Sequence, residues 1–391
     1  MNVAVFTDND FDKVNGVTTT LSAALAHAPA GMRLRIYTAA VLPVEAPNYL
    51  ALKSFGVPIP FYSEMQMYVP KLRAYLEHAR ADGVDVIHLT TPGPIGLAAM
   101  YTARRLGLPM VGSFHTDLAA YTALLSGSAR LGALMREYMR WPYSRCARVL
   151  VPSEDTRRLL IGAKGDSRRI EIWRRGVDTA LFSPQKRSVT LRDSWHVSDK
   201  RPAILYVGRV SREKGLHLLP SIQSRLEALG LPHRMIIAGQ GPMLEQLRRQ
   251  LPDALFTGVL SREHVADVFA SSDLFVFPSR TDTAGNVVLE AQASGLPVVV
   301  TDTGGPRENM VDGVTGVVRT DDDPVRWAHA IADVLHGSRR PRMADAARAY
   351  ALTRQWGTAL QPLYRAYRDA CAVASPASPA DMLTLTGRTS R

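Results

Sequence analysis

Short apolar segments alternate with longer helical patterns along this chain, and that alternation constrains its fold more than any other feature. In the first half, each apolar segment is rich in β-branched residues and is followed by a longer segment with helical spacing. The pattern is seen at residues 2–7, 34–39, 85–90, 109–116 and 148–153. Strands separated by helices are typical of βαβ units and a parallel sheet.

A second series of apolar segments follows residue 202. Its strand candidates are residues 203–209, 234–239, 255–259, 273–279, 296–302 and 316–320. The region between the two series, residues 177–202, is polar and is broken by Pro184 and Pro202. The chain of 391 residues also has the length of about two domains.

We therefore predict two doubly wound α/β domains that face each other across a cleft. The first covers residues 1–183 and the second residues 184–354. In such domains ligands bind outside the carboxyl ends of the strands. Residues 374–391 have no periodicity and are expected to form a disordered tail.

Composition limits the classes of function. Two cysteines, Cys146 and Cys371, fit no disulfide or metal framework and favour a reducing, cytoplasmic location. We see neither a signal peptide nor a membrane-spanning segment. The formal net charge of +11 suits phosphates, anionic lipid or nucleic acid. Aromatic residues make up 7% of the chain and show no stacking pattern, which disfavours nucleic acid.

The segment from Thr281 to Val300 is apolar but contains two carboxylates, with seven residues between Asp282 and Glu290. We predict that Asn286 is the N-cap of a short helix over residues 287–294, which Gly295 ends. Gly285 permits close approach of the backbone to a ligand. Free amides at the helix start would form an anion site, with Asp282 in the loop above it.

Glu290 lies inside this predicted helix, between two buried strands. An unpaired carboxylate would be costly there, so it needs a donor. A buried ion pair or cap would supply one, and so would the hydroxyl groups of a ligand.

Two cations lie at the corner between a strand and the next helix. Gly208 and Arg209 follow a strand, and Lys214 is predicted to open a helix. Both cations would neutralise a diphosphate in the cleft; the alternative is a pair of solvated surface cations. Gly239 and Gly241 follow the next strand, but the third glycine of a dinucleotide fingerprint is missing, which favours a plain turn.

His115 and an acidic loop complete the candidates. His115 lies at the carboxyl end of a strand, where a role in the cleft competes with simple packing. Asp8, Asp10 and Asp12 follow the first strand and have the spacing of a carboxylate clamp for a divalent ion. The helix start predicted at Gly16 favours anion binding by backbone amides instead, so we predict no metal.

Taken together, these motifs resemble the retaining glycosyltransferases of the GT-B fold, in the family-4 group that includes bacterial mannosyltransferases and sulfoquinovosyl-type glycolipid synthases. The resemblance covers about residues 1–373. It is carried, in order, by the segments NGVTTTL, DVIHLTTPGPIG, FHTD, VPSEDT, RGVDTALFSP, VGRVSREKGL, AGQGP and TDTAGNVVLEAQASGLPVVVTDTGGPRE.

The resemblance implies a role for each matching residue. Arg209 and Lys214 would hold the diphosphate of a nucleotide-sugar donor. Glu290 would bind the ribose hydroxyls of that donor, and Gly16 would lie in the loop that touches the diphosphate or the acceptor. The backbone around Val259 would meet the base.

The remaining roles concern the transferred sugar. Asp282 would touch its hydroxyls and His115 would lie beside it. Sugar and phosphate would also meet the backbone amides near Ala284, Gly285 and Asn286. The implied catalytic residues are therefore His115, Asp282, Arg209 and Lys214.

The sequence departs from the family pattern at two positions. Asp282 replaces the usual Glu, so its reach is one methylene shorter, and Ala284 stands where an aromatic residue is frequent. The family fold also returns its last helix, here about residues 355–373, to the first domain. Retention would need no enzymic nucleophile, because the acceptor hydroxyl would attack from the front while the leaving diphosphate accepts its proton.

The resemblance implies no cofactor and a donor such as GDP-mannose or a UDP-hexose, with mannose favoured over a glucose-type sugar. The acceptor would be a hydroxyl of a lipid or glycan. A sugar-nucleotide epimerase on the same architecture is the alternative, and an NAD-dependent oxidoreductase is a weaker one.

Residues 129–148 further predict peripheral association with an anionic membrane surface. They place apolar and aromatic residues near one helical face with arginines around it. The alternative is a helix that packs on the sheet. The apolar set is Leu131, Leu134, Met135, Tyr138 and Trp141, and the basic set is Arg130, Arg136 and Arg140.

Overall fold

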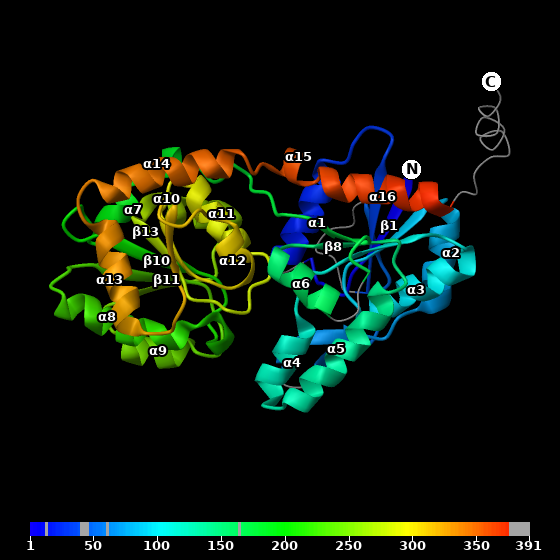
Figure 1. Cartoon of the computed structure of the whole chain (residues 1–391), viewed down its shortest axis with the longest axis horizontal. Helices are drawn as coiled ribbons and strands as arrows, with labels where there is room; N and C mark the ends of the chain where they lie inside the picture. The colour runs from blue at the N-terminus through cyan, green and yellow to red at the C-terminus, as the bar shows by residue number, and fades with distance from the viewer. Residues whose placement is uncertain (12–14, 40–46, 60–61, 163–165, 375–391) are drawn as a thin grey trace, which may run out of the picture.

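The computed structural model describes residues 1–11, 15–39, 47–59, 62–162 and 166–374. These residues form two α/β halves, each built around one parallel sheet (Figure 1). The predicted fold class is therefore confirmed. Asp12 and the predicted tail beyond residue 374 lie outside the described residues, and the boundaries of the two domains remain predictions.

The first half contains a sheet in the strand order β3-β2-β1-β6-β7-β8-β9. Neighbouring strands in this sheet are parallel. The strands are β1 (Asn2–Phe6), β2 (Arg33–Thr38), β3 (Tyr49–Ala51), β6 (Val86–Leu89), β7 (Met110–Ser113), β8 (Arg148–Val151) and β9 (Ile170–Ile172). The sequence did not predict β3, β9 or the antiparallel hairpin of β4 (Gly56–Ile59) and β5 (Tyr62–Tyr68).

Helices connect these strands, as expected for parallel pairing. They are α1 (Gly16–Ala26), α2 (Leu72–Ala81), α3 (Pro94–Leu106), α4 (Leu118–Ser126), α5 (Ala129–Tyr143) and α6 (Glu154–Gly162). The α4–α5 pair extends away from the sheet (Figure 1). Gly132 lets these two helices pack closely, because a Cβ there would lie 2.7 Å from Cβ of Ala123.

The second half contains a sheet in the order β12-β11-β10-β13-β14-β15. Its strands are β10 (Ala203–Val207), β11 (Arg234–Ala238), β12 (Leu255–Gly258), β13 (Leu274–Phe277), β14 (Val298–Thr301) and β15 (Gly316–Arg319). Its helices are α7 (Val189–Ser194), α8 (Leu219–Ala228), α9 (Leu244–Gln250), α10 (Arg262–Ser271), α11 (Asn286–Ala293), α12 (Gly304–Glu308), α13 (Pro324–Leu335) and α14 (Arg339–Leu352).

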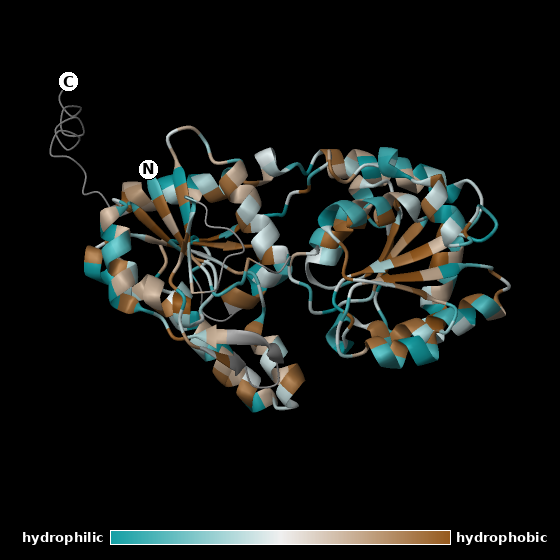
Figure 2. Ribbon diagram, turned by 180° about the vertical axis from the view of Figure 1, so that it is seen from behind, coloured by the Kyte–Doolittle hydropathy of each residue, from teal (hydrophilic) through white to brown (hydrophobic). Residues whose placement is uncertain are grey.

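Both sheets lie inside the molecule. Figure 2 shows mainly hydrophobic strands enclosed by helices with one hydrophobic and one hydrophilic side. Every residue of β10, β13 and β14 is buried. Continuous apolar strands are what a parallel sheet covered on both faces requires, which is why the sequence predicted these strands well.

The end of the chain returns to the first half. After α15 (Trp356–Ala359), helix α16 (Gln361–Ala374) packs against β6, β7 and β8. Tyr364, Tyr367 and Leu363 are fully buried there in one apolar cluster with residues of β1 and β2. The structure thus places the last helix where the resemblance implied.

The segment that joins the halves is tied to the second half by one buried carboxylate. Asp273, which is 6% exposed, accepts hydrogen bonds from Arg187 (2.9 Å), from Arg192 (2.9 Å) and from the amide of Ala203 (2.8 Å). Arg340 of α14 pairs with the same carboxylate at 3.2 Å. Three guanidinium groups and an amide offset the cost of burying this charge.

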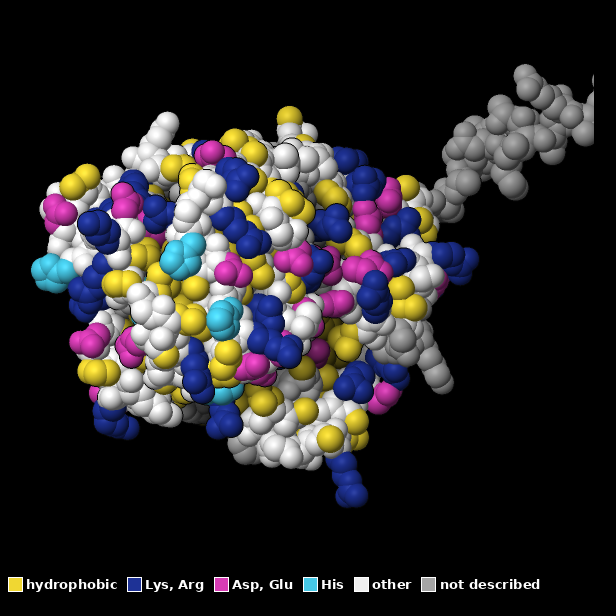
Figure 3. Space-filling model, turned by 60° about the vertical axis from the view of Figure 1, so that its left-hand side comes forward, with side chains coloured by type: hydrophobic (Ala, Val, Ile, Leu, Met, Phe, Trp, Pro, Cys, Tyr) yellow, Lys and Arg dark blue, Asp and Glu magenta, His cyan; other side chains and the backbone are white. Residues whose placement is uncertain are grey.

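The surface charge is dispersed on the face shown in Figure 3, where Lys and Arg side chains alternate with Asp and Glu side chains. Within the described residues, no helix has the length and apolar character that a bilayer crossing requires.

Candidate active site

A loop between β13 and α11, residues 282–286, is organised by one carboxylate; we name it the Asp282 loop. One oxygen of Asp282, Oδ2, lies 2.9 Å from Nζ of Lys214. The other, Oδ1, accepts hydrogen bonds from the amides of Gly285 (2.7 Å) and Ala284 (3.2 Å). The loop therefore folds back on its own first side chain.

The two partners stabilise each other's charged form. Burial alone would raise the pKa of Asp282, but Lys214 and the two amides lower it below its usual value. Burial likewise disfavours the charged form of Lys214, yet Asp282 and the nearby Tyr121 and Tyr206 raise its pKa. An ion pair of this kind persists across the neutral pH range.

The start of α11 differs from the prediction. Its N-cap is Gly285, with a φ of 63°, and Asn286 is the first helical residue, so the predicted Asn286 cap was wrong. A Cβ at Gly285 would lie 2.6 Å from the amide nitrogen of Pro306, and positive φ is disfavoured for other residues. The amides of Ala284 and Gly285, which were expected to be free, donate to Asp282 in the structure.

Two hydrogen bonds join the Asp282 loop to the first half. The hydroxyl of Thr283 donates to the carbonyl oxygen of His115 at 2.5 Å. The side-chain amide of Asn286 donates to the carbonyl oxygen of Gly16, at the start of α1, at 3.3 Å. The loop therefore lies where the carboxyl ends of the two sheets meet, as doubly wound folds place their ligand sites.

His115 is buried behind this contact. Its side chain is 7% exposed, and both ring nitrogens have protein partners. Nε2 lies 2.7 Å from Oγ of Ser113, and Nδ1 lies 3.2 Å from a guanidinium nitrogen of Arg175. In this structure the backbone carbonyl of His115, rather than its ring, meets the Asp282 loop.

Glu290 has no partner among the described residues. It lies half-buried in α11, and neither a hydrogen bond nor an ion pair engages its carboxylate within the described ranges. Burial raises its pKa to about 7, although Arg262 opposes the shift. The alternative of a buried ion pair or cap is therefore not seen among the described residues.

The positions of three other predicted residues, Arg209, Lys214 and Val259, are also defined by the structure. Arg209 follows β10, and its Nε lies 3.7 Å from Glu213. Lys214 ends a 3₁₀ turn, Arg212–Lys214, and so does not open an α-helix as predicted. Val259 follows β12 and is 67% exposed.

The glycines after β11 are required by packing. A Cβ at Gly239 would lie 1.9 Å from the carbonyl oxygen of Gly208, and one at Gly241 would lie 2.4 Å from that of Val210. Close backbone approach explains both glycines, as the interpretation of a plain turn predicted.

The acidic loop after β1 is also engaged by the protein. Asp8 accepts hydrogen bonds from the hydroxyl of Thr91 (2.7 Å) and the amide of Ile95 (2.9 Å), and so caps α3. The hydroxyl of Tyr68 donates to Asp10 at 3.2 Å. No group of three or more His, Cys, Asp or Glu side chains suited to a metal ion occurs in the part of the chain that the structure describes.

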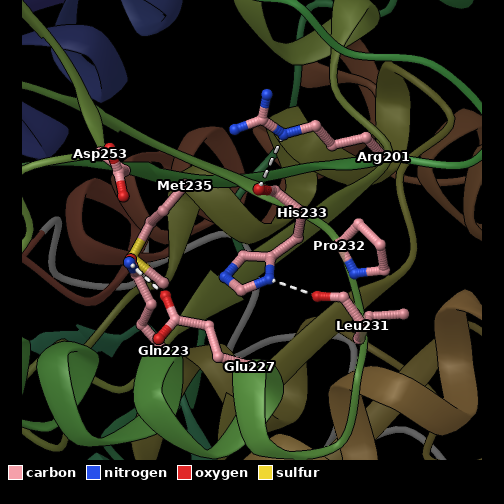
Figure 4. A pocket seen from close by; sticks show the side chains of 8 residues that line it. All are labelled: Arg201, Gln223, Glu227, Leu231, Pro232, His233, Met235 and Asp253. Carbon is pink, nitrogen blue, oxygen red and sulfur yellow. Dashed lines mark hydrogen bonds between the residues drawn. The ribbon is translucent and has the colours of Figure 1, made fainter.

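A small cavity lies away from this site. Its volume is about 240 Å³, and Figure 4 shows the side chains that line it. Three of them, Arg201, His233 and Asp253, precede the strands β10, β11 and β12. Its lining is Arg201, Gln223, Glu227, Leu231, Pro232, His233, Met235 and Asp253. None of the predicted site residues contributes to it.

Comparisons with known families agree with this arrangement. The model described as Glycosyltransferase Family 4 matches residues 14–181. The model described as Glycosyl transferases group 1 matches residues 201–337. Two matches in this order cover the two halves of a GT-B glycosyltransferase.

Relatives extend the match over nearly the whole chain. A GDP-mannose-dependent alpha-mannosyltransferase of Corynebacterium glutamicum is 32% identical over 95% of this chain and 90% of its own length. A protein with the same description from Mycobacterium tuberculosis is 32% identical over 91% of this chain and 93% of its own. The chain therefore belongs to the family-4 glycosyltransferases.

Solved structures share the fold. Sucrose-phosphate synthase from Thermosynechococcus elongatus superposes with a TM-score of 0.78 at 17% identity, over 95% of this chain and 99% of its own. Anabaena HepE in complex with UDP superposes with a TM-score of 0.75 at 18% identity, over 94% and 100%.

Sequence reasoning missed three residues that shape this site: Thr283, Tyr121 and Arg175. Thr283 stands between two predicted residues, so its position offered a signal. Tyr121 of α4 approaches Lys214 only through the arrangement of the two halves. Arg175 lies among several other arginines in the sequence, which gives no sign of its burial, yet it is 1% exposed.

We predict that Glu290→Gln stabilises the ligand-free protein at high pH. In the folded protein the Glu290 carboxyl group has a pKa of about 7, whereas the ordinary value for a glutamate side chain is 4.5. Stability therefore falls as the pH rises from about 4.5 to about 7. Because Gln cannot ionise, the variant should exceed the wild type by about 1–3 kcal/mol at pH 8 and match it at pH 4.

Thermal unfolding at pH 4, 6 and 8 measures this difference. Glu245→Gln is the control, because Glu245 is 71% exposed in its pair with Arg248 and should change stability little at any pH. The prediction would be contradicted if the difference in stability between Glu290→Gln and the wild type were the same at pH 4 and at pH 8.

Proposed function

We propose that this protein is a retaining hexosyltransferase that transfers mannose from GDP-mannose to a hydroxyl group of a lipid or glycan. The observation that carries the proposal is the near-full-length similarity to GDP-mannose-dependent alpha-mannosyltransferases, combined with the arrangement of Asp282 and Lys214 in an ion pair at the start of α11. A UDP-hexose donor is the second choice, because the fold also occurs in a protein solved with UDP-glucose.

Lys214 and Arg209 would bind the donor diphosphate. Lys214 has a raised pKa and so carries its charge throughout the neutral range. The first amides of a helix have no acceptors inside it, so the start of α11 would add donors for the phosphates. Together these groups would stabilise the charge that develops on the leaving diphosphate.

Asp282 would both hold the loop and contact the sugar. A carboxylate has about four acceptor positions, and Lys214 with the amides of Ala284 and Gly285 uses three of them. One position is left for a sugar hydroxyl. Ala284 leaves space beside the sugar, and Gly16 lies opposite through its contact with Asn286.

Glu290 would accept hydrogen bonds from the ribose hydroxyls. Its carboxylate has no other donor within the described residues, and hydroxyl donors favour the ionised form. Nucleotide binding should therefore lower the pKa of Glu290 from about 7. Val259, exposed beside β12, would lie near the base.

The reaction would proceed by attack from the front. The acceptor oxygen forms a bond to the anomeric carbon as the bond from that carbon to the diphosphate oxygen breaks. The acceptor proton passes to the departing phosphate oxygen. Configuration is retained because nucleophile and leaving group occupy the same face, and no protein nucleophile is needed.

We predict metal-independent release of nucleotide. Protein incubated with a panel of nucleotide sugars should release GDP from GDP-mannose faster than UDP from UDP-hexoses. Excess EDTA should change the rate of nucleotide release by less than about twofold. Cationic side chains and backbone amides would stabilise the charge on the leaving diphosphate, as a metal ion does in other enzymes. Loss of activity with EDTA and its recovery with Mg²⁺ or Mn²⁺ would contradict this, and release from no nucleotide sugar would contradict the proposed function.

The α4–α5 hairpin would bring the protein to a lipid acceptor. Leu131, Leu134, Tyr138 and Trp141 are exposed on α5, at a spacing that places them on one face. The basic residues Arg130, Arg136 and Arg140 surround them, as in helices that lie on anionic membranes. Met135 instead packs against the core, so this member of the predicted face was wrong.

We predict that the protein floats with vesicles containing anionic phosphatidylglycerol and that Leu134→Glu lowers the bound fraction several-fold. A negative charge at a side chain that is 66% exposed on this face opposes both apolar insertion and the anionic surface. Val189→Glu, at a 73% exposed position of α7, is the matched control and should bind like the wild type. The prediction would be contradicted if the wild type stayed in the supernatant equally with and without the anionic vesicles, or if Leu134→Glu floated with them as well as the wild type does.

A further inference from the structure

A chain of buried polar side chains crosses the first half of the molecule. Nη2 of Arg175 lies 3.2 Å from Nδ1 of His115, and Nε2 of His115 lies 2.7 Å from Oγ of Ser113. Oγ of Ser113 lies 2.8 Å from Nε2 of His88, and Nδ1 of His88 lies 2.7 Å from the hydroxyl of Tyr367. All five side chains belong to residues that are at most 7% exposed.

Arg175 fixes the direction of every bond in this chain. A guanidinium group has donors but no acceptor, so Nδ1 of His115 must accept. Neutral His115 then carries its proton on Nε2 and donates to Ser113. The Ser113 hydroxyl is left to donate to Nε2 of His88, so His88 donates from Nδ1 to the hydroxyl of Tyr367.

The guanidinium group of Arg175 is an unusual group to bury. It stacks over the ring of Trp173, with Cζ 4.4 Å from the centroid, but no carboxylate pairs with it in the described residues and its Nε has no partner. A buried cation without a counter-ion is costly. Burial, with Arg175 close by, lowers the pKa of His115 well below its usual value, so the imidazole stays neutral.

The two ends of the chain lie at functionally different places. At one end of the chain, the backbone carbonyl oxygen of His115 accepts a hydrogen bond from the hydroxyl of Thr283 at 2.5 Å. Thr283 directly follows Asp282. At the far end of the chain, Tyr367 belongs to α16, which follows the second half in sequence but packs on the first. The chain thus links the returning helix to the point where the Asp282 loop docks.

We propose that Arg175, Ser113, His88 and Tyr367 are positioning residues for the transfer reaction. They hold His115 as its neutral Nε2–H tautomer and thereby fix the segment after β7 that receives Thr283. The proposal rests on the proposed function in one respect, that the Asp282 loop binds the donor sugar.

Helix α16 offers a matched pair of variants. Tyr367→Phe removes the last acceptor of the chain. Tyr364→Phe removes a buried hydroxyl of the same helix that donates to the carbonyl oxygen of Ala24 at 2.9 Å, outside the chain. Both variants lose one buried hydrogen bond, so a purely structural role predicts equal effects.

We expect Tyr367→Phe to lower kcat for sugar transfer about five- to tenfold, the rate equivalent of one hydrogen bond. Affinity for the free nucleoside diphosphate, measured by calorimetry, should stay within about twofold because Lys214 and Glu290 are untouched. Tyr364→Phe should match the wild type in both. Equal kcat values for the two variants would overturn the proposal.

A spectroscopic measurement tests the chain without turnover. In protein labelled with ¹⁵N-histidine, the His115 resonances, assigned by their loss in His115→Asn, should show a protonated Nε2 and an unprotonated Nδ1. Arg175→Met should release that tautomer, and Arg175→Lys, which keeps a cationic donor, should restore it in part. A wild-type spectrum with Nδ1 protonated would overturn the proposal.

The two measurements separate this proposal from the proposed function. If the wild type transfers no sugar from any nucleotide donor, the proposed function fails, and the histidine spectra still decide whether the chain exists. If the wild type is active but the tautomer or the contrast between Tyr367→Phe and Tyr364→Phe is missing, the chain is not a positioning device.

Discussion

The ion pair between Asp282 and Lys214 is the interaction on which the rest of the site depends. It joins the loop after β13 to the turn after β10, and these strands are neighbours in the second sheet. The same carboxylate draws in the amides of Ala284 and Gly285, which sets the start of α11. A single side chain therefore determines where a cation, a helix terminus and a loop converge, at the carboxyl edge where doubly wound folds bind ligands.

The docking of the two halves extends from this loop. Thr283 and Asn286 donate hydrogen bonds to residues of the first half. Beside them, a carboxylate at each of the helices α6 and α12 accepts hydrogen bonds from backbone amides at the start of the other helix. The Glu308 carboxylate accepts from the amides of Glu154 (2.6 Å) and Asp155 (3.2 Å), and Asp155 accepts from the amide of Gly304 at 2.8 Å. Because helix starts present unsatisfied amides, each half supplies a carboxylate that the other needs.

The sequence predicted best the strands that are buried on both faces. Buried parallel strands such as β10 and β14 are continuously apolar, and the cations after β10 follow from strand-to-helix geometry, so Arg209 and Lys214 were found at the right edge. The Asn286 cap was predicted wrongly because propensity favours Asn, whereas the contact of Gly285 with Pro306 forces a left-handed backbone one residue earlier. The burial of Arg175 and the engagement of both His115 nitrogens depend on residues 60 positions apart, which no local pattern encodes.

We propose that Asp282 and Lys214 act as one unit in sugar transfer, and a double-mutant cycle tests this coupling most directly. The measurement is kcat/KM for the donor in the wild type, Asp282→Asn, Lys214→Met and the double variant. We predict that the double variant is no slower than the slower single variant, because either change alone already releases the loop. The coupling free energy should then be about 1–3 kcal/mol. If the loss of kcat/KM in the double variant equals the product of the losses in the two single variants, the two residues act independently and the proposal is contradicted.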